Sequence, residues 1–225
     1  MERQKSMNTM QQARNKLAAK NTLLIAIIIL FHFVGLIGLS SSLTHDVFIQ
    51  IVPFHLLLML GVIVYSHHHL NQNFLFFAAF IYVLGFYAEW VGVHTGLLFG
   101  NYAYGETLGL KLFDIPLMIG VNWFLLIYAT GVSIQRYMFK TVLGRVIAGS
   151  FVLVILDFLI EPVAVEFDQW HWEGYRIPFS NYVCWFFVSA IMLYMFEKFK
   201  FSRQSIVAPV FLLTQFIFFV VLHWI

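Results

Sequence analysis

Three carboxylic acids lie inside apolar stretches of the chain, where acids are rare. Asp157 and Glu161 belong to "DFLIEPVAVE", and Glu89 follows another apolar run. Asp157 and Glu161 are four residues apart, so a helix would project both from one face. Pro162 disfavours helical geometry at Glu161, which predicts a kink at the acid. Close carboxylates cannot easily both ionise, so such a pair can hold a proton and donate it at neutral pH.

Acids inside apolar segments, together with many aromatic residues, suit a reaction through a carbocation. Aromatic residues make up 19% of the chain, and their ring faces stabilise a passing cation. This combination predicts protonation of an alkene in a lipid, followed by capture of the carbocation. Capture by water is hydration, and capture by another double bond is cyclisation. Neither reaction needs a redox cofactor, so we expect no cofactor and no metal.

The composition indicates which elements must position the acids. Hydrophobic residues make up 61% and charged residues 11% of the 225 residues, and the mean hydropathy is +0.83. Soluble domains lie far from these values, so we interpret the chain as an all-α polytopic membrane protein. Apolar runs of roughly 20 residues, long enough to cross a bilayer, occur at 21–40, 47–66, 74–95, 116–138, 142–165, 179–196 and 205–224.

The distribution of basic residues predicts the topology. Residues 1–20 are polar and basic, and the apolar segment behind them is too long for a signal-peptide core. We therefore expect a cytoplasmic segment over 1–20 and a single transmembrane domain over 21–225. All Lys and Arg except Lys111 and Arg176 fall on one face of the seven-span model. This asymmetry predicts a multi-pass protein of the inner (plasma) membrane, with the N-terminus inside and the C-terminus outside. It also explains the net charge without a nucleic-acid partner.

Two segments share an order of acid, aromatic loop and returning helix. One runs from Glu89 to "IPLMIGVNWF" and the other from Glu161 to "IPFSNYVCWF", with identical spacing between Ile-Pro and Trp-Phe. We interpret them as a degenerate two-helix repeat about an axis along the membrane normal, which would place Glu89 opposite Glu161. The first copy contains the extra residues "GETLGLKLFD". We expect this insertion to cover the outer mouth as a lid or re-entrant hairpin.

The motifs "EWVGVHTGLLFGNYAYG", "IPLMIGVNW", "DFLIEP" and "IPFSNYVCW" resemble those of the carotenoid biosynthesis family that contains the CruF-type carotenoid 1′,2′-hydratases, including bisanhydrobacterioruberin hydratases. The resemblance covers residues 74–185. It implies addition of water across the terminal isopropylidene double bond of an acyclic carotenoid, giving a tertiary alcohol. It also implies a distant likeness to small membrane lycopene cyclases. The chain departs from the family at Leu98, where proline is more frequent, and at Glu161, where aspartate is common.

Under this resemblance, Glu89 and the Asp157/Glu161 pair would protonate C2 and activate the water that attacks C1, with the division of roles open. A histidine could orient water or relay a proton, or cap a loop. Asparagines could position water or join helices. Aromatic side chains could contact the cation or the polyene, or anchor the protein at the interface. The candidates for substrate binding are His94, Asn122, Asn181, Tyr87, Tyr102, Trp123 and Trp185.

The expected partners are a carotenoid in the bilayer, water and other enzymes of carotenoid biosynthesis, and the oligomeric state stays open. Two alternatives remain. One is a lycopene-cyclase-like end-group cyclase, and the other is a proton-coupled carrier or non-catalytic lipid-binding protein, because buried acids and repeats also mark transporters. The stretch "SHHHL" does not predict a di-iron site, which needs histidines at helical spacings on several segments. His32 and His223 are expected to be hydrogen-bonded within the bundle.

Overall fold

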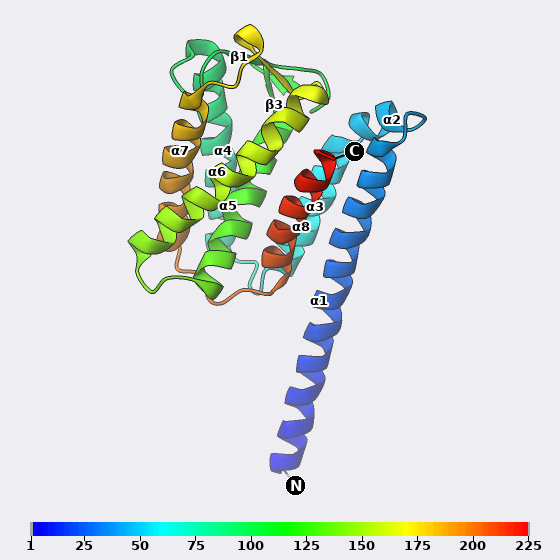
Figure 1. Cartoon of the computed structure of the whole chain (residues 1–225). Helices are drawn as coiled ribbons and strands as arrows, with labels where there is room; N and C mark the ends of the chain where they lie inside the picture. The colour runs from blue at the N-terminus through cyan, green and yellow to red at the C-terminus, as the bar shows by residue number, and fades with distance from the viewer. Residues whose placement is uncertain (1, 225) are drawn as a thin grey trace.

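The computed structural model describes residues 2–224 and forms a bundle of helices with small strand pairs at one end (Figure 1). Five helices are long and apolar enough to cross a membrane. They are α1 (Glu2–Ser40), α4 (Gln72–Thr95), α5 (Leu117–Tyr137), α6 (Val142–Glu166) and α7 (Phe179–Lys198). The remaining helices are α2 (His45–Gln50), α3 (Val52–Ser66) and α8 (Val207–Leu222). The all-α polytopic class predicted from composition is therefore confirmed.

The helices fall on the predicted spans, with one difference. The run 47–66, predicted as a single span, contains the end of α2 at Gln50 and the start of α3 at Val52. Pro53 stands in the first turn of α3, where its missing amide is tolerated, but it could not continue a preceding helix. The spans predicted near residues 47–66 and 205–224 correspond to the two shorter apolar helices, α3 and α8.

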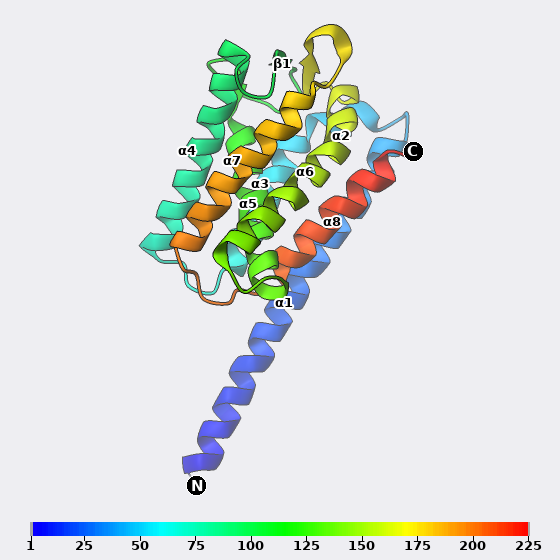
Figure 2. The ribbon, with the colours of Figure 1, turned by 60° about the vertical axis from the view of Figure 1, so that its left-hand side comes forward.

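The helices are arranged around α5, which contacts α3, α4, α6, α7 and α8. Helices α1 and α8 lie side by side on one flank, and α4 and α7 lie on the other (Figure 2). The first part of α1 projects beyond the bundle, away from the strand pairs (Figure 1). This arrangement leaves the helices that carry the acids, α4 and α6, beside the central helix.

Two short strand pairs close the end of the bundle that we call the strand end. Strand β1 (Tyr102–Tyr104) pairs antiparallel with β4 (Trp170–Trp172), and β2 (Lys111–Leu112) pairs with β3 (Ile115–Pro116). The short 3-10 helix η1 (Glu173–Tyr175) follows β4. The insertion at 105–114 forms part of the β2–β3 hairpin, and its Leu108 is buried.

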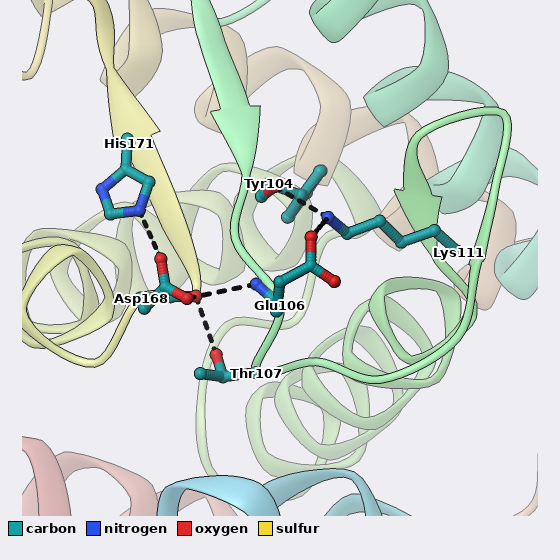
Figure 3. Close-up of polar contacts among 6 residues, drawn as sticks. All are labelled: Tyr104, Glu106, Thr107, Lys111, Asp168 and His171. Carbon is teal, nitrogen blue, oxygen red and sulfur yellow. Dashed lines mark hydrogen bonds and ion pairs between the residues drawn. The ribbon is translucent and has the colours of Figure 1, made fainter.

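Hydrogen bonds fasten this insertion to the segment after α6 (Figure 3). The backbone amide of Glu106 donates to Asp168 Oδ2 (3.2 Å), and Lys111 Nζ donates to the Glu106 carboxylate (2.8 Å). The hydrogen bond between His171 and Asp168 lowers the pKa of the Asp168 carboxyl below its ordinary value. These contacts hold the insertion against the β1–β4 pair, which lies over the acids.

Candidate active site

Glu89 lies near the end of α4 and is 5% exposed. Its Oε2 accepts hydrogen bonds from the hydroxyls of Tyr102 (2.5 Å) and Tyr104 (2.7 Å). Its Oε1 accepts one from the indole Nε1 of Trp123 on α5 (2.8 Å). The two tyrosines reach the same carboxylate because alternate residues of a strand share one face. Gly92 permits this approach, since a Cβ there would lie 2.7 Å from the Tyr102 hydroxyl.

The two tyrosines act as proton-bearing donors to Glu89. Burial raises the pKa of both phenols, Tyr102 and Tyr104, well above the ordinary value for tyrosine. The neighbouring Glu89 carboxylate raises both pKa values further. Both phenols therefore keep their protons at neutral pH. Glu89 thus receives three hydrogen bonds from neutral groups.

Glu161 lies on α6 and is 1% exposed. Its Oε2 accepts hydrogen bonds from the indole nitrogens of Trp170 (3.0 Å) and Trp172 (2.8 Å) on β4. Asn181 on α7 donates through Nδ2 to Glu161 Oε1 and to Asp157 Oδ2, both at 2.9 Å. One amide group therefore bridges the two acids that the sequence placed on one helix face.

Asp157 lies one turn before Glu161 on α6. It is buried, and its Oδ1 has no hydrogen-bond partner within the described part of the chain. Helix α6 continues past Pro162 to Glu166. The proline therefore does not end the helix at the acid, and Asp157 and Glu161 remain one turn apart.

The two copies of the predicted repeat meet at this site. In the β1–β4 pair, Tyr102 lies opposite Trp172 and Tyr104 lies opposite Trp170. Deeper in the bundle, the rings of Trp123 and Trp185 stack with centroids 4.3 Å apart and planes 22° apart. The antiparallel pairing of the two strands and the stacking of the corresponding tryptophans support the two-helix repeat.

A cavity of about 20 Å³ lies between the two acids. A cavity holds a water molecule when roughly 10–15 Å³ is accessible to its centre, so this one takes about one water. Both Glu89 and Glu161 line it, whereas Asp157 does not. The other lining residues are Phe99, Tyr102, Tyr104, Ile119, Asn122, Ile160, Trp170, Trp172, Asn181 and Trp185.

A second cavity of about 510 Å³ adjoins the first and has mainly apolar walls. Helices α1, α3, α6 and α8 contribute to its lining, and so does Leu108 of the insertion. Four residues line both cavities: Ile119, Asn122, Ile160 and Trp170. Asn122 lines both cavities, and no hydrogen bond from its amide to another residue is found among residues 2–224. An apolar ligand in the larger cavity would thus reach the water-sized cavity at Asn122.

Two predicted substrate contacts lie away from both cavities. Tyr87 is exposed and stacks on Trp90 (5.8 Å). His94 bonds the Trp90 carbonyl within its own helix (3.0 Å) and lies 3.8 Å from the exposed Asp114. His94 therefore lies outside the site formed by the acids. Four other predicted residues line the small cavity: Asn122, Asn181, Tyr102 and Trp185. Trp123 does not line it but donates a hydrogen bond to Glu89, which does.

Tyr104, Trp170 and Trp172 are site residues that the sequence analysis did not select. Each donates a hydrogen bond to Glu89 or Glu161. Their signal in the sequence is the alternation in "YAY" and "WHW", which puts both rings of each strand on one side but spans only three residues. Within residues 2–224, no group of three or more His, Cys, Asp or Glu side chains is placed to hold a metal ion.

Fold and site together define a polytopic membrane protein with two buried carboxylates around a water-sized cavity. Residues 51–225 match the model of the carotenoid biosynthesis protein family, and the chain belongs to that family. It is 27% identical over 125 residues to the bisanhydrobacterioruberin hydratase of Haloarcula japonica. The match covers 52% of this chain and 42% of that protein, so the chain spans less than half of its relative. No solved structure matches the chain.

Proposed function

We propose that this protein is a carotenoid hydratase that adds water across the terminal isopropylidene C1=C2 double bond of an acyclic carotenoid. The family and the name of the relative support action on carotenoids. The observation that carries the reaction type is the shared cavity, where Glu89 and Glu161 line a space for about one water next to a large apolar cavity. Water held between two carboxyl groups beside an apolar ligand is the arrangement that hydration requires.

The reaction proceeds in two proton transfers. The Asp157/Glu161 pair gives a proton to C2, the π electrons of C1=C2 form the new C–H bond, and C1 becomes a tertiary cation. An oxygen lone pair of the water forms the C1–O bond, and Glu89 accepts the proton that the water loses. The carotenoid gains one hydrogen and one hydroxyl group. Return of the proton from Glu89 to the pair restores the starting state, so no cofactor is consumed.

The hydrogen bonds of the two acids favour this division of roles. Glu89 receives three donors and has no second acid on its helix, which suits the group that accepts a proton. Glu161 is joined to Asp157 through the Asn181 amide, so the pair can keep one proton between two carboxyl groups. Trp170 and Trp185 line the cavity, and an aromatic face is worth about 0.5–2 kcal/mol to a nearby cation.

The larger cavity provides a route from the bilayer to the acids. Phe31 and Phe54 line it and are themselves exposed on the flank of the bundle. We expect the carotenoid to enter there from the inner (plasma) membrane, with the strand end outside and the N-terminus in the cytoplasm. Other enzymes of carotenoid biosynthesis are the expected partners, since they would deliver the substrate in the same bilayer.

Expression in cells that accumulate lycopene tests the proposal. We expect a pigment heavier by one water, and two waters if both ends react. A product of equal mass with an altered spectrum would identify a cyclase instead. Absence of any new pigment from cells with normal levels of folded protein would favour a carrier or lipid-binding protein.

A further inference from the structure

A second polar cluster lies in the larger cavity and takes no part in the proposed reaction. His32 on α1, His55 on α3 and Gln215 on α8 all line the cavity, and His32 is 3% exposed. Polar groups in an apolar cavity cost free energy unless they are hydrogen-bonded. The family match begins at residue 51, so α1, which supplies His32 and one wall of the cavity, lies outside the matched region.

The hydrogen bonds of His32 fix which atoms of the cluster can donate. His32 Nδ1 lies 2.7 Å from the carbonyl oxygen of Ile28, which can only accept, so Nδ1 carries the proton. His32 Nε2 is then an acceptor, and Gln215 Nε2 donates to it at 2.7 Å. The amide of Gln215 is therefore oriented, and its Oε1 is left as an acceptor.

His55 supplies the remaining polar atoms. Its ring stands edge-to-face on His32, with centroids 4.7 Å apart and planes 81° apart. Among residues 2–224, no hydrogen bond from this ring to another residue is found. A neutral imidazole has one N–H donor and one acceptor nitrogen. The cluster thus presents a donor and an acceptor from His55 beside the acceptor of Gln215.

We infer that His55 and Gln215, held by His32, form a binding subsite for a hydroxyl group of an isoprenoid ligand. A hydroxyl both donates and accepts, so it satisfies Gln215 Oε1 and the His55 N–H together, whereas a ketone oxygen can only accept and a hydrocarbon does neither. The subsite shares its cavity with Asn122 at the acid site, so the hydroxyl belongs to the same end of the ligand as the double bond. The isoprenoid nature of the ligand rests on the proposed function.

Paired probes test the subsite by binding alone. The probes are a short acyclic isoprenoid alcohol with an isopropylidene end and the hydrocarbon of the same skeleton. Affinity for the full chain in lipid nanodiscs is corrected with empty nanodiscs. Wild type is expected to bind the alcohol about tenfold more tightly, the gain from one or two hydrogen bonds.

Variants locate the preference. His55→Phe keeps a ring against His32 and is expected to reduce the preference to about threefold or less, with the hydrocarbon affinity unchanged. The double variant His32→Phe/Gln215→Leu removes both partners of one bond, which tends to preserve stability, and it should also lose the preference. Thr214→Val, on the same helix, removes a hydroxyl that bonds its own backbone and should behave as wild type.

Equal affinity of wild type for the two probes would overturn the inference, and so would a preference that survives in His55→Phe. Carotenoid hydration by the same preparations separates this inference from the proposed function. Hydration without an alcohol preference contradicts only the subsite. An alcohol preference without hydration contradicts only the proposed reaction.

Discussion

The two halves of the site hold equivalent carboxylates with different chemistry. Glu89 on α4 receives two phenol hydroxyls from β1, and Glu161 on α6 receives two indole N–H groups from β4. One turn before Glu161 stands Asp157, whereas one turn before Glu89 stands Gly85. A Cβ on Gly85 would lie 2.6 Å from Trp123, so the glycine makes room for the indole that donates to Glu89.

This difference shows how one backbone plan can give its two acids separate roles. A phenol can donate and accept a hydrogen bond, whereas an indole only donates one. The Glu89 half therefore holds its carboxylate with two hydroxyl groups whose oxygens can still accept a hydrogen bond from water. The Glu161 half has fixed donors and a second acid that can share its proton. Substitutions in each half test this contrast.

The largest effects are expected at the two cavity-lining acids. Glu89→Gln and Glu161→Gln keep the shape but cannot exchange a proton, so each should lower turnover by about 100-fold or more. Turnover is measured as hydroxylated carotenoid per amount of folded protein. Glu166→Gln alters an exposed acid on the same helix as Glu161 and should leave turnover unchanged. Wild-type turnover in either amide variant would remove that acid from the reaction.

Asp157→Asn should lower turnover less, by about tenfold, because Asp157 acts through the proton it shares with Glu161. Asp157 lines neither cavity. In the double variant Asp157→Asn/Glu161→Gln, turnover should equal that of Glu161→Gln alone, since residues acting as a unit are not additive. Additive losses would show that the two acids act separately.

Substitutions of the aromatic hydrogen-bond donors should lower turnover by different amounts in the two halves. Tyr104→Phe removes one of the three hydrogen bonds to Glu89 and a hydroxyl oxygen that can accept one from water, and we expect turnover to fall by about tenfold. Trp170→Phe keeps an aromatic face and loses one hydrogen bond, so a fall of about threefold is expected. Single-turnover rates with saturating substrate give the comparison. A larger loss for the tryptophan would reverse the roles assigned to the two halves.

The smallest effect is expected where the halves are joined at the strand end. The folded-state pKa of Asp168 is lowered by the bond with His171, so its stabilisation is present above the unfolded pKa of about 3.9 and is lost as pH falls through the folded value. Asp168→Asn should lower the melting temperature at neutral pH by no more than about 2–4 °C. The melting temperature of the variant should fall less than that of wild type as the pH is lowered, and turnover should be unchanged. A loss of turnover would give this junction a role in catalysis.

The sequence was sufficient to predict the helical class and the meeting of Glu89 with Glu161, because apolar length and repeated Ile-Pro and Trp-Phe spacing are local patterns. The position of a residue along its helix was easier to predict than the direction of its side chain. Tyr87 precedes Glu89 by two residues, and a helix turns by roughly 200° over that distance, so its ring points away from the cavity. Tyr104 and Trp170 were missed because three-residue strands are too short for their alternation to stand out.

The larger cavity could not be predicted for a different reason. His32, His55 and Gln215 come from three helices far apart in the sequence, and no local pattern relates them. The division of the run 47–66 has a local cause, since Pro53 marks the start of α3. The apolar run therefore predicted where helical structure lies, but not that the run is divided between α2 and α3.

The most direct test of a water molecule captured between two carboxyl groups is isotope incorporation by purified protein. The carotenoid is supplied in lipid nanodiscs in buffer made with heavy-oxygen water, and in a second experiment with deuterium oxide. We expect one heavy oxygen in the new hydroxyl group and one deuterium at C2, with neither in Glu89→Gln or Glu161→Gln. Deuterium without oxygen in a product of otherwise unchanged mass, or a hydroxyl oxygen that does not come from water, would contradict the account.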